Sequence, residues 1–301
     1  MTVAVLASSE DALTLKKILS ALAKAGVDAY GLMLHPNWES LGREQLISRF
    51  EKATHFIALV SRSSINASWF IFAAGYSYSR TASCTLARFD EHFSLPPFIS
   101  GLPVLASLAE IESYYKAEMQ SWLVQDERRA SRAALLEMGI SCHNDALAQC
   151  ARDGDTKAVE LFLKAGFHPD IRDKYGVPLL CLSARGKHLA VAQILLERGA
   201  QLNLQSEDRG YSPLMDAAQA GSADLVRLFL EKGADPNLKS KDGQTALVVA
   251  VGRNDAEVAR LLVEGGADAD EADKLGLSAR TYAALVKNPA ILSLFDASPG
   301  S

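Results

Sequence analysis

The chain has 301 residues, 49% of them hydrophobic and 22% charged, and its formal net charge is −5. A length above what one hydrophobic core usually serves predicts about two domains, and the composition excludes a mainly disordered chain. No apolar run approaches the roughly 20 residues of a membrane-spanning helix, and no Lys or Arg precedes a long apolar segment near residue 1, so we expect neither a membrane span nor a secretory signal. The mixed charge is not typical of nucleic-acid binding. We therefore expect a cytoplasmic protein with neither a membrane nor a nucleic-acid partner.

Residues 1 to about 125 alternate short apolar runs with amphipathic segments. The apolar runs predict strands near residues 3–7, 27–32, 55–60, 84–89 and 103–105. The amphipathic segments predict helices near residues 12–25, 43–53, 68–79 and 108–124. Such alternation is typical of a parallel sheet that is covered on both faces. Right-handed crossovers then predict a doubly wound, flavodoxin-like α/β domain with the strand order 2-1-3-4-5.

Two stretches of this half carry a family resemblance. Residues 5–11 read VLASSED, a buried strand that runs into a Ser-Ser-Glu-Asp turn. Residues 57–76 read IALVSRSSINASWFIFAAGY, an apolar strand followed by a serine-rich loop and a helix that opens with Ser-x-Trp. These words resemble the first box, the third strand and the following helix of Toll/interleukin-receptor (TIR) domains. The resemblance covers about a third of the chain and implies a TIR-like domain over residues 1–125.

The resemblance also bears on chemistry. In enzymatically active TIR domains, which hydrolyse NAD, a glutamate follows the tryptophan by four residues, and here that position is Ala73. A methyl group offers neither a carboxylate for the positive charge that develops on the ribose nor a nucleophile. Glu10 and Glu91 are the acids that would have to substitute for it. We therefore expect a non-enzymatic domain, with an NAD-cleaving or nucleoside-processing hydrolase, regulated by the second half of the chain, as the alternative.

A nucleotide could still bind without being turned over. Near the carboxyl ends of the predicted strands, serine and arginine can hold a phosphate or a ribose, and a tryptophan can stack on a base. The candidates are Ser8, Ser9, Trp38, Arg43, Ser61, Arg62 and Ser64. The sequence has no Gly-rich phosphate loop and no CxxC pair among its four cysteines. We therefore expect no metal and no resident cofactor, with NAD or another nucleotide as a ligand only.

An apolar stripe marks the predicted helix 108–124. It comprises Ile111, Tyr114, Tyr115, Met119, Trp122 and Leu123. The stripe predicts a helix that packs on the sheet, whereas the charged stretch 126–132 predicts a separate connecting and capping helix over residues 126–140. No Gly/Pro/Ser-rich linker divides the two halves, so we expect them to be held rigidly together.

The second half of the chain repeats itself every 33 or 34 residues. One ladder of glycines consists of Gly166, Gly199, Gly233 and Gly266. A second ladder consists of Gly176, Gly210, Gly243 and Gly276. Each glycine of the first ladder follows a helical stripe such as Val226, Phe229 and Leu230, and it fits the left-handed residue that commonly ends a helix.

The repeated words resemble the ankyrin repeat, a β-turn plus two antiparallel helices. The family's Thr-Pro-Leu-His-x-Ala word appears as SPLMDA at residues 212–217 and, more loosely, as TALVVA at residues 245–250. Cys181, Met215 and Val248 replace the family histidine. The resemblance implies an all-α helical solenoid over residues 141–301, with about four repeats and a shortened capping unit at residues 273–296.

An ankyrin stack implies a concave surface of turn tips and first helices that binds a protein partner. The matching positions are Lys174, Tyr175, Arg185, Arg209, Tyr211, Asp216, Gln219, Lys241, Gln244 and Arg253. Charge reversal at Arg209 and Arg253 is expected to weaken that partner without lowering thermal stability. We expect a signalling protein whose stack captures a partner while the TIR-like domain self-associates, as a homo-oligomer, or senses a nucleotide.

Overall fold

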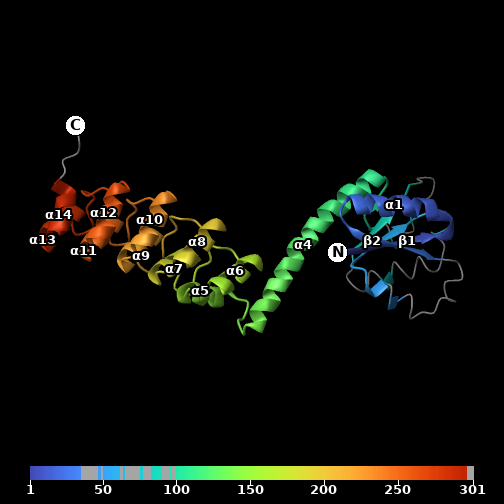
Figure 1. Ribbon diagram of the computed structural model, residues 1–301, viewed down its shortest axis with the longest axis horizontal. Helices are drawn as coiled ribbons and strands as arrows, with labels where there is room; N and C mark the ends of the chain where they lie inside the picture. Colours follow the sequence, from blue (N-terminus) through green and yellow to red (C-terminus); the bar gives the residue numbers. More distant parts are fainter. Residues whose placement is uncertain are drawn as a thin grey trace. The chain divides into compact units, whose positions relative to one another are not determined.

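The computed structural model describes residues 1–34, 47–48, 50–61, 64, 75–76, 83–89, 95, 99 and 101–296. The chain divides into two compact units, Met1–Asp126 and Glu127–Ser301 (Figure 1). In the part of the chain that the structure describes, no helix is long and apolar enough to cross a membrane.

The N-terminal unit is built around a parallel sheet. Its strands are β1 (Thr2–Ser8), β2 (Asp28–Leu34), β3 (His55–Leu59), β4 (Ser83–Ala87) and β5 (Val104–Leu105). They lie in the order β2-β1-β3-β4-β5, and every neighbouring pair is parallel. The predicted parallel sheet and its strand order are therefore confirmed.

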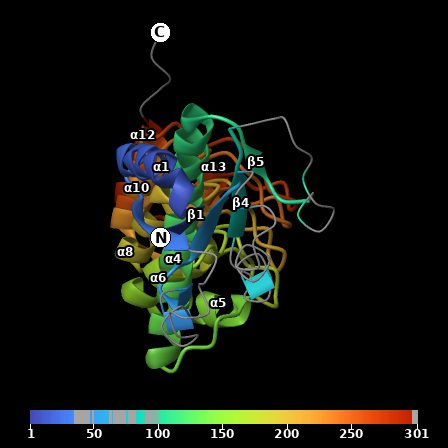
Figure 2. The same ribbon diagram turned by 90° about the vertical axis from the view of Figure 1, so that its right-hand side faces the viewer.

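Both faces of the sheet are covered, which explains why β1 is an uninterrupted apolar run. Alternate residues of a strand point to opposite faces. Val3 and Val5 pack in a core with α1 (Ala12–Lys24) and the first turns of α4 (Leu108–Glu137), and Figure 2 shows α1 and α4 next to β1. Ala4 and Leu6 face the second core, which contains Phe50. The short helix η1 (Ser9–Asp11) follows β1 directly at the carboxyl end of the sheet.

One long helix occupies the segment where two were predicted. α4 runs without a break from Leu108 to Glu137. Charge does not end a helix, and this segment contains no glycine or proline while being rich in alanine, glutamate and arginine, all strong helix formers. The predicted apolar stripe is shorter than expected, because Ile111 and Tyr115 are buried against the sheet whereas Leu123 is exposed.

The C-terminal unit stacks pairs of antiparallel helices (Figure 1). The pairs are α5 (Asn144–Asp153) with α6 (Thr156–Lys164), α7 (Leu179–Arg185) with α8 (Leu189–Glu197), α9 (Pro213–Ala220) with α10 (Ala223–Glu231), α11 (Ala246–Gly252) with α12 (Ala256–Glu264), and α13 (Ala279–Val286) with α14 (Pro289–Asp296). One continuous core extends from Leu135 to Phe295. The first helices pack against each other along the unit, as do the second helices, so each pair buries its apolar face on its neighbours.

The repeated turn chemistry explains where these helices begin and end. The Ser212 hydroxyl accepts a hydrogen bond from the backbone N–H of Met215, and Pro213 occupies the first turn of α9, where its missing N–H costs nothing. All eight glycines of the two ladders have φ between +68° and +94°, as predicted for the first ladder. At Gly210 a side chain is doubly excluded, because a Cβ would also lie 2.8 Å from the backbone nitrogen of Lys241.

Candidate functional site

Four long loops join each second helix to the next first helix. They span residues 165–178, 198–212, 232–245 and 265–278, and their backbones are hydrogen-bonded to one another. The N–H groups of Glu207, Lys241 and Lys274 donate to the carbonyls of Gly176, Arg209 and Asp242 in the preceding loop, each over 3.0 Å. Loops tied in this way form a fixed row, so the side chains at their tips have set positions.

In a second row of hydrogen bonds, side chains of one loop donate to backbone carbonyls of the next loop. The Arg172 guanidinium donates to the carbonyl of Gln205 over 2.9 Å, and the Gln205 amide donates to the carbonyl of Lys239 over 2.7 Å. The Lys239 ammonium continues the row to the carbonyl of Ala272. The loops therefore use many of their own acceptors internally.

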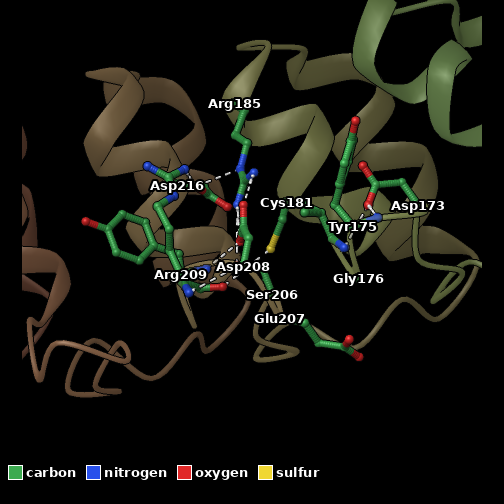
Figure 3. Close-up of polar contacts among 12 residues, drawn as sticks. Asp173, Tyr175, Gly176, Cys181, Arg185, Ser206, Glu207, Asp208, Arg209 and Asp216 are labelled. Atoms are coloured by element: carbon green, nitrogen blue, oxygen red, sulfur yellow. Dashed lines mark hydrogen bonds and ion pairs between the residues drawn. The ribbon is translucent and has the colours of Figure 1, made fainter.

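A cluster of four charged residues lies where the second long loop meets the first helices. We call Arg185, Asp208, Arg209 and Asp216 the Arg185 cluster (Figure 3). The Arg185 Nε donates to Asp216 Oδ1 over 3.0 Å, and its Nη1 donates to Asp208 Oδ2 over 2.7 Å. The Arg209 Nη2 donates to the same Asp216 oxygen over 2.9 Å. One buried carboxylate thus holds a first helix, the next first helix and the loop between them together.

The two carboxylates of the cluster differ in their electrostatics. Burial raises the pKa of Asp216 above its usual value, and the charge and hydrogen bond of Arg185 offset only part of that rise. Asp216 is 1% exposed, and its Oδ2 has no hydrogen-bond partner within the described chain. In contrast, the hydrogen bonds from Arg185 hold the pKa of the more accessible Asp208 well below its usual value. Ionised Asp216 therefore depends on its two arginines.

A pocket of about 450 Å³ opens beside the Arg185 cluster. We call it the Arg152 pocket; it is lined by Arg152, Asp173, Tyr175, Val177, Leu182, Arg185, Gly186 and Asp208. The Arg152 Nη2 donates to Asp173 Oδ2 over 2.7 Å. Figure 3 shows Tyr175 standing beside Asp173, while Arg185 runs toward Asp208 and Asp216. The pocket combines guanidinium groups, an exposed aromatic ring and an apolar floor.

A separate polar group lies at the carboxyl end of the N-terminal sheet. Asp11 Oδ2 accepts hydrogen bonds from the hydroxyls of Ser8, over 2.6 Å, and Ser61, over 2.7 Å. The buried Ser64 hydroxyl accepts from the Ser61 N–H over 2.8 Å and donates to the carbonyl of Leu59. Ser8 ends β1 and Ser61 follows β3, so the group lies at the point where the strand order changes direction.

The comparisons with known proteins settle the family. Residues 147–240 and 214–298 match the family of ankyrin repeats (3 copies) and together cover about half of the chain. A putative ankyrin repeat-containing protein of Treponema pallidum (strain Nichols) is 37% identical over 244 residues, which are 81% of this chain and 82% of that protein. The chain belongs to the ankyrin-repeat family.

The similar proteins differ in how much of the chain they share. Because Glu127–Ser301 holds fewer residues than the treponemal alignment, that similarity extends into the N-terminal unit. The 2-5A-dependent ribonuclease of Homo sapiens is 40% identical over 72 residues, 24% of this chain and 10% of that protein. Ankyrin repeat and SAM domain-containing protein 6 of Mus musculus is 34% identical over 88 residues, 29% of this chain and 10% of that protein. These two likenesses span small parts of long proteins.

The ankyrin stack brings most of the residues proposed for partner binding onto the long loops and first helices. Lys174, Tyr175, Arg209, Tyr211, Lys241 and Gln244 lie on the loops, Arg185, Asp216 and Gln219 on first helices, and Arg253 directly after α11. Two of them lie beneath the surface. Asp216 is buried in the Arg185 cluster, and Tyr211 is buried with its hydroxyl donating to Gln244 Oε1 over 3.1 Å.

Outside the repeats, the structure brings together three of the serines proposed for nucleotide binding. Ser8, Ser61 and Ser64 share one hydrogen-bonded group, while Ser9 begins η1. The acid at the centre of this group is Asp11, whereas Glu10 beside it is exposed. Trp38, Arg43, Arg62, Ala73 and Glu91 lie outside the described residues. Among the described residues, no group of three or more His, Cys, Asp or Glu could hold a metal ion.

The sequence analysis missed both the Arg185 cluster as a unit and the Arg152 pocket. Arg152 and Arg185 stand 33 residues apart, at the last turns of α5 and α7, and each pairs with an aspartate in the loop that follows. The 33-residue spacing of the two arginines could have indicated this arrangement, because residues one repeat apart lie side by side in a stack. The two arginines nevertheless meet aspartates at different places in their loops, since Asp173 lies three residues before Gly176 whereas Asp208 lies two residues before Gly210.

Proposed function

We propose that this protein binds another protein through the face of the ankyrin stack formed by the long loops and the first helices. The support is the row of hydrogen-bonded loops, whose backbone is already ordered, so that less entropy is lost when a partner binds. Two surface side chains on this face, Tyr175 and Arg253, are of the types that interfaces use as anchors. Tyr175 is 62% exposed, and the exposed Arg253 guanidinium has no hydrogen-bond or ion-pair partner among the described residues.

Arg253 provides the test of this face. Arg253→Glu is expected to weaken the partner about tenfold or more while leaving the melting temperature unchanged, because the side chain is exposed and unpaired. The partner is first recovered from a lysate on the immobilised full chain, and its affinity for each variant is then measured by titration calorimetry. Glu257→Arg is the matched control, an exposed charge reversal on the second helix α12. Equal affinities for the wild type and Arg253→Glu would refute this part of the surface.

Arg209 is unsuited to the same experiment, which corrects the expectation from sequence. Its guanidinium contacts the buried carboxylate of Asp216 and lies 4.4 Å from the ring centroid of Tyr211. A glutamate at residue 209 would place a second negative charge beside Asp216. Charge reversal there would lower stability as well as binding, so a loss of affinity would not identify a contact.

The group around Asp11 favours a second role, in the N-terminal unit. We infer that it binds a nucleotide without turnover, through the TIR-like architecture that the sequence resembles. The observation that supports this is the position of Asp11 and its two serine hydroxyls at the strand-order switch of a parallel sheet, where such folds bind ligands. Carboxylate and hydroxyl groups are suited to hold the hydroxyls of a ribose.

NAD is the probe for this second role. Calorimetric titration of the full chain with NAD is expected to show binding that Asp11→Ala weakens about tenfold or more, with Glu10→Gln as the control because Glu10 is exposed. Nicotinamide release is followed in parallel, and sedimentation velocity with and without NAD reports self-association. Release that is lost in Glu10→Gln or Glu91→Gln would establish the hydrolase instead. No NAD binding would remove the nucleotide role.

A further inference from the structure

The Arg152 pocket offers hydrogen-bond donors but few acceptors. Asp173 Oδ1 accepts from the N–H groups of Tyr175 and Val177, and its Oδ2 accepts from Arg152. Asp208 Oδ1 accepts from the Arg209 N–H and from Arg185 Nη2, and its Oδ2 accepts from Arg185 Nη1. Every carboxylate oxygen that lines the pocket is therefore already engaged.

The donors are not all engaged. A guanidinium carries five N–H donors. Arg152 uses one on Gln149 Oε1, over 3.0 Å, and one on Asp173 Oδ2, and no further hydrogen bond of its side chain occurs among the residues described. Its side chain is 42% exposed, so a partner can reach part of it. Arg185 differs, because Asp208, Asp216 and Ser206 accept four hydrogen bonds from its guanidinium.

A further cation lies beside Tyr175, which lines the pocket. The Lys174 ammonium lies 5.1 Å from the centroid of the Tyr175 ring and has no ion-pair partner in the described chain. A lysine or arginine of a partner would meet Arg152 and Lys174 and find only carboxylates that are already paired. An acidic group would meet open donors on both. The cations near the pocket keep unused hydrogen-bond donors whereas its carboxylates are already paired, so an anionic partner group is favoured.

The pocket is larger than a carboxylate needs and is not polar throughout. Val177, Leu182 and the exposed Tyr175 ring are among the residues that line it. An apolar side chain placed there could contact these apolar groups, as an interface anchor does. The volume of about 450 Å³ accommodates a carboxylate together with a neighbouring apolar side chain.

We propose that the Arg152 pocket receives an acidic residue and an adjacent apolar residue of the protein partner. The carboxylate of the partner accepts from the open donors of Arg152, and the apolar side chain packs on Tyr175, Val177 and Leu182. This inference rests on the proposed function, in which the long loops and first helices bind a protein, and it specifies the chemistry of the segment that is recognised.

Selection from a phage-displayed library of random linear peptides on the immobilised full chain tests the proposal. The enriched peptides are expected to share Asp or Glu next to a large apolar residue. A synthetic enriched peptide is expected to lose affinity about tenfold or more when its acid is changed to the amide, or when the protein carries Arg152→Gln. The two changes together are expected to cost little more than either alone, since both remove the same contact.

Two further variants keep the result interpretable. Tyr175→Ala leaves Arg152 in place and is expected to weaken the peptide through its apolar residue, while the sensitivity to the acid remains. Arg253→Glu lies outside the pocket lining and separates the two proposals. Basic or neutral consensus peptides, an empty selection, or peptides indifferent to both Arg152→Gln and Tyr175→Ala would overturn the pocket inference. Peptides whose affinity falls with Arg253→Glu alone would also overturn the pocket inference, but they would support the proposed function.

Discussion

Replacing Arg185 by methionine is expected to lower the free energy of unfolding of the ankyrin stack by about 3 kcal/mol. Methionine keeps much of the aliphatic stem but removes two hydrogen bonds to Asp208 and one of the two guanidinium groups that pair with the buried carboxylate of Asp216. Breaking a buried ion pair is costly because the remaining charge stays buried with less compensation. After the substitution, only Arg209 pairs with the Asp216 carboxylate. Hydrogen exchange by mass spectrometry on the full chain, read at the amides of α7 and α9, measures the change.

The pH dependence separates this cause from a loss of packing. Burial raises the folded-state pKa of Asp216 above the unfolded value, so stability linked to its proton is present at low pH and is lost as the pH rises through the folded pKa. Removing Arg185 raises that pKa further. The deficit of Arg185→Met is therefore expected to be smaller at about pH 5 than at about pH 7.5. A deficit that is the same at both values would indicate lost packing instead.

A double-mutant cycle provides the control for the pair. Asp216→Leu in the Arg185→Met background removes the buried charge along with its partner, and it is expected to recover most of the loss. If the double variant were as unstable as the sum of the two single variants, the Arg185–Asp216 contact would not be the source of the effect.

Replacing Phe229 by alanine is expected to cost about 4 kcal/mol, because it removes a large side chain from a fully buried site and leaves a cavity. Phe229 belongs to α10, which packs against α8, α9 and α12, so the cavity lies between neighbouring repeats. Stability in a stack is a sum of repeat and interface contributions, and a defect at an inner repeat weakens both of its interfaces. Faster hydrogen exchange is therefore expected in α8 and α12 as well as in α10.

Leu285→Ala is the matched control for Phe229→Ala. Leu285 lies on α13 of the last helix pair and is 65% exposed, so its truncation opens no cavity and is expected to change stability by less than about 0.5 kcal/mol. Protection in α8 and α12 that is unaffected by Phe229→Ala would contradict coupling between the repeats. A large effect of Leu285→Ala would show that the exposed leucine is packed in solution.

The helix boundaries of the stack could be predicted because they depend on local chemistry. Glycine is the residue that adopts positive φ without strain, so the first ladder predicted helix ends that the structure confirms. The sheet was predictable for a related reason, since an apolar run such as β1, buried on both faces, is typical of a parallel strand. The break expected in α4 was wrong because charged residues do not end a helix, as glycine and proline do.

The binding features depend on contacts between residues that are distant in the sequence. In the sequence, Arg185 and Asp216 are both charged residues of a first helix and are expected to be exposed. In the structure, Asp216 is buried and Arg185 lines a pocket. Glu10 and Asp11 are neighbours in one acidic turn, and only the path of β3, which brings Ser61 to β1, distinguishes Asp11. Whether a side chain is buried or paired depends on the residues around it in the fold rather than on its residue type.

By itself, the sequence determined the period, the turns, the parallel sheet and hence the ankyrin-repeat character of the second half. These follow from backbone preferences and from the spacing of apolar residues, which act over a few residues at a time. The tertiary structure alone decided which charges are buried, which donors of Arg152 stay open and where a pocket forms. Those properties depend on contacts between residues about one repeat apart, and the spacing of apolar residues along the chain does not specify such contacts.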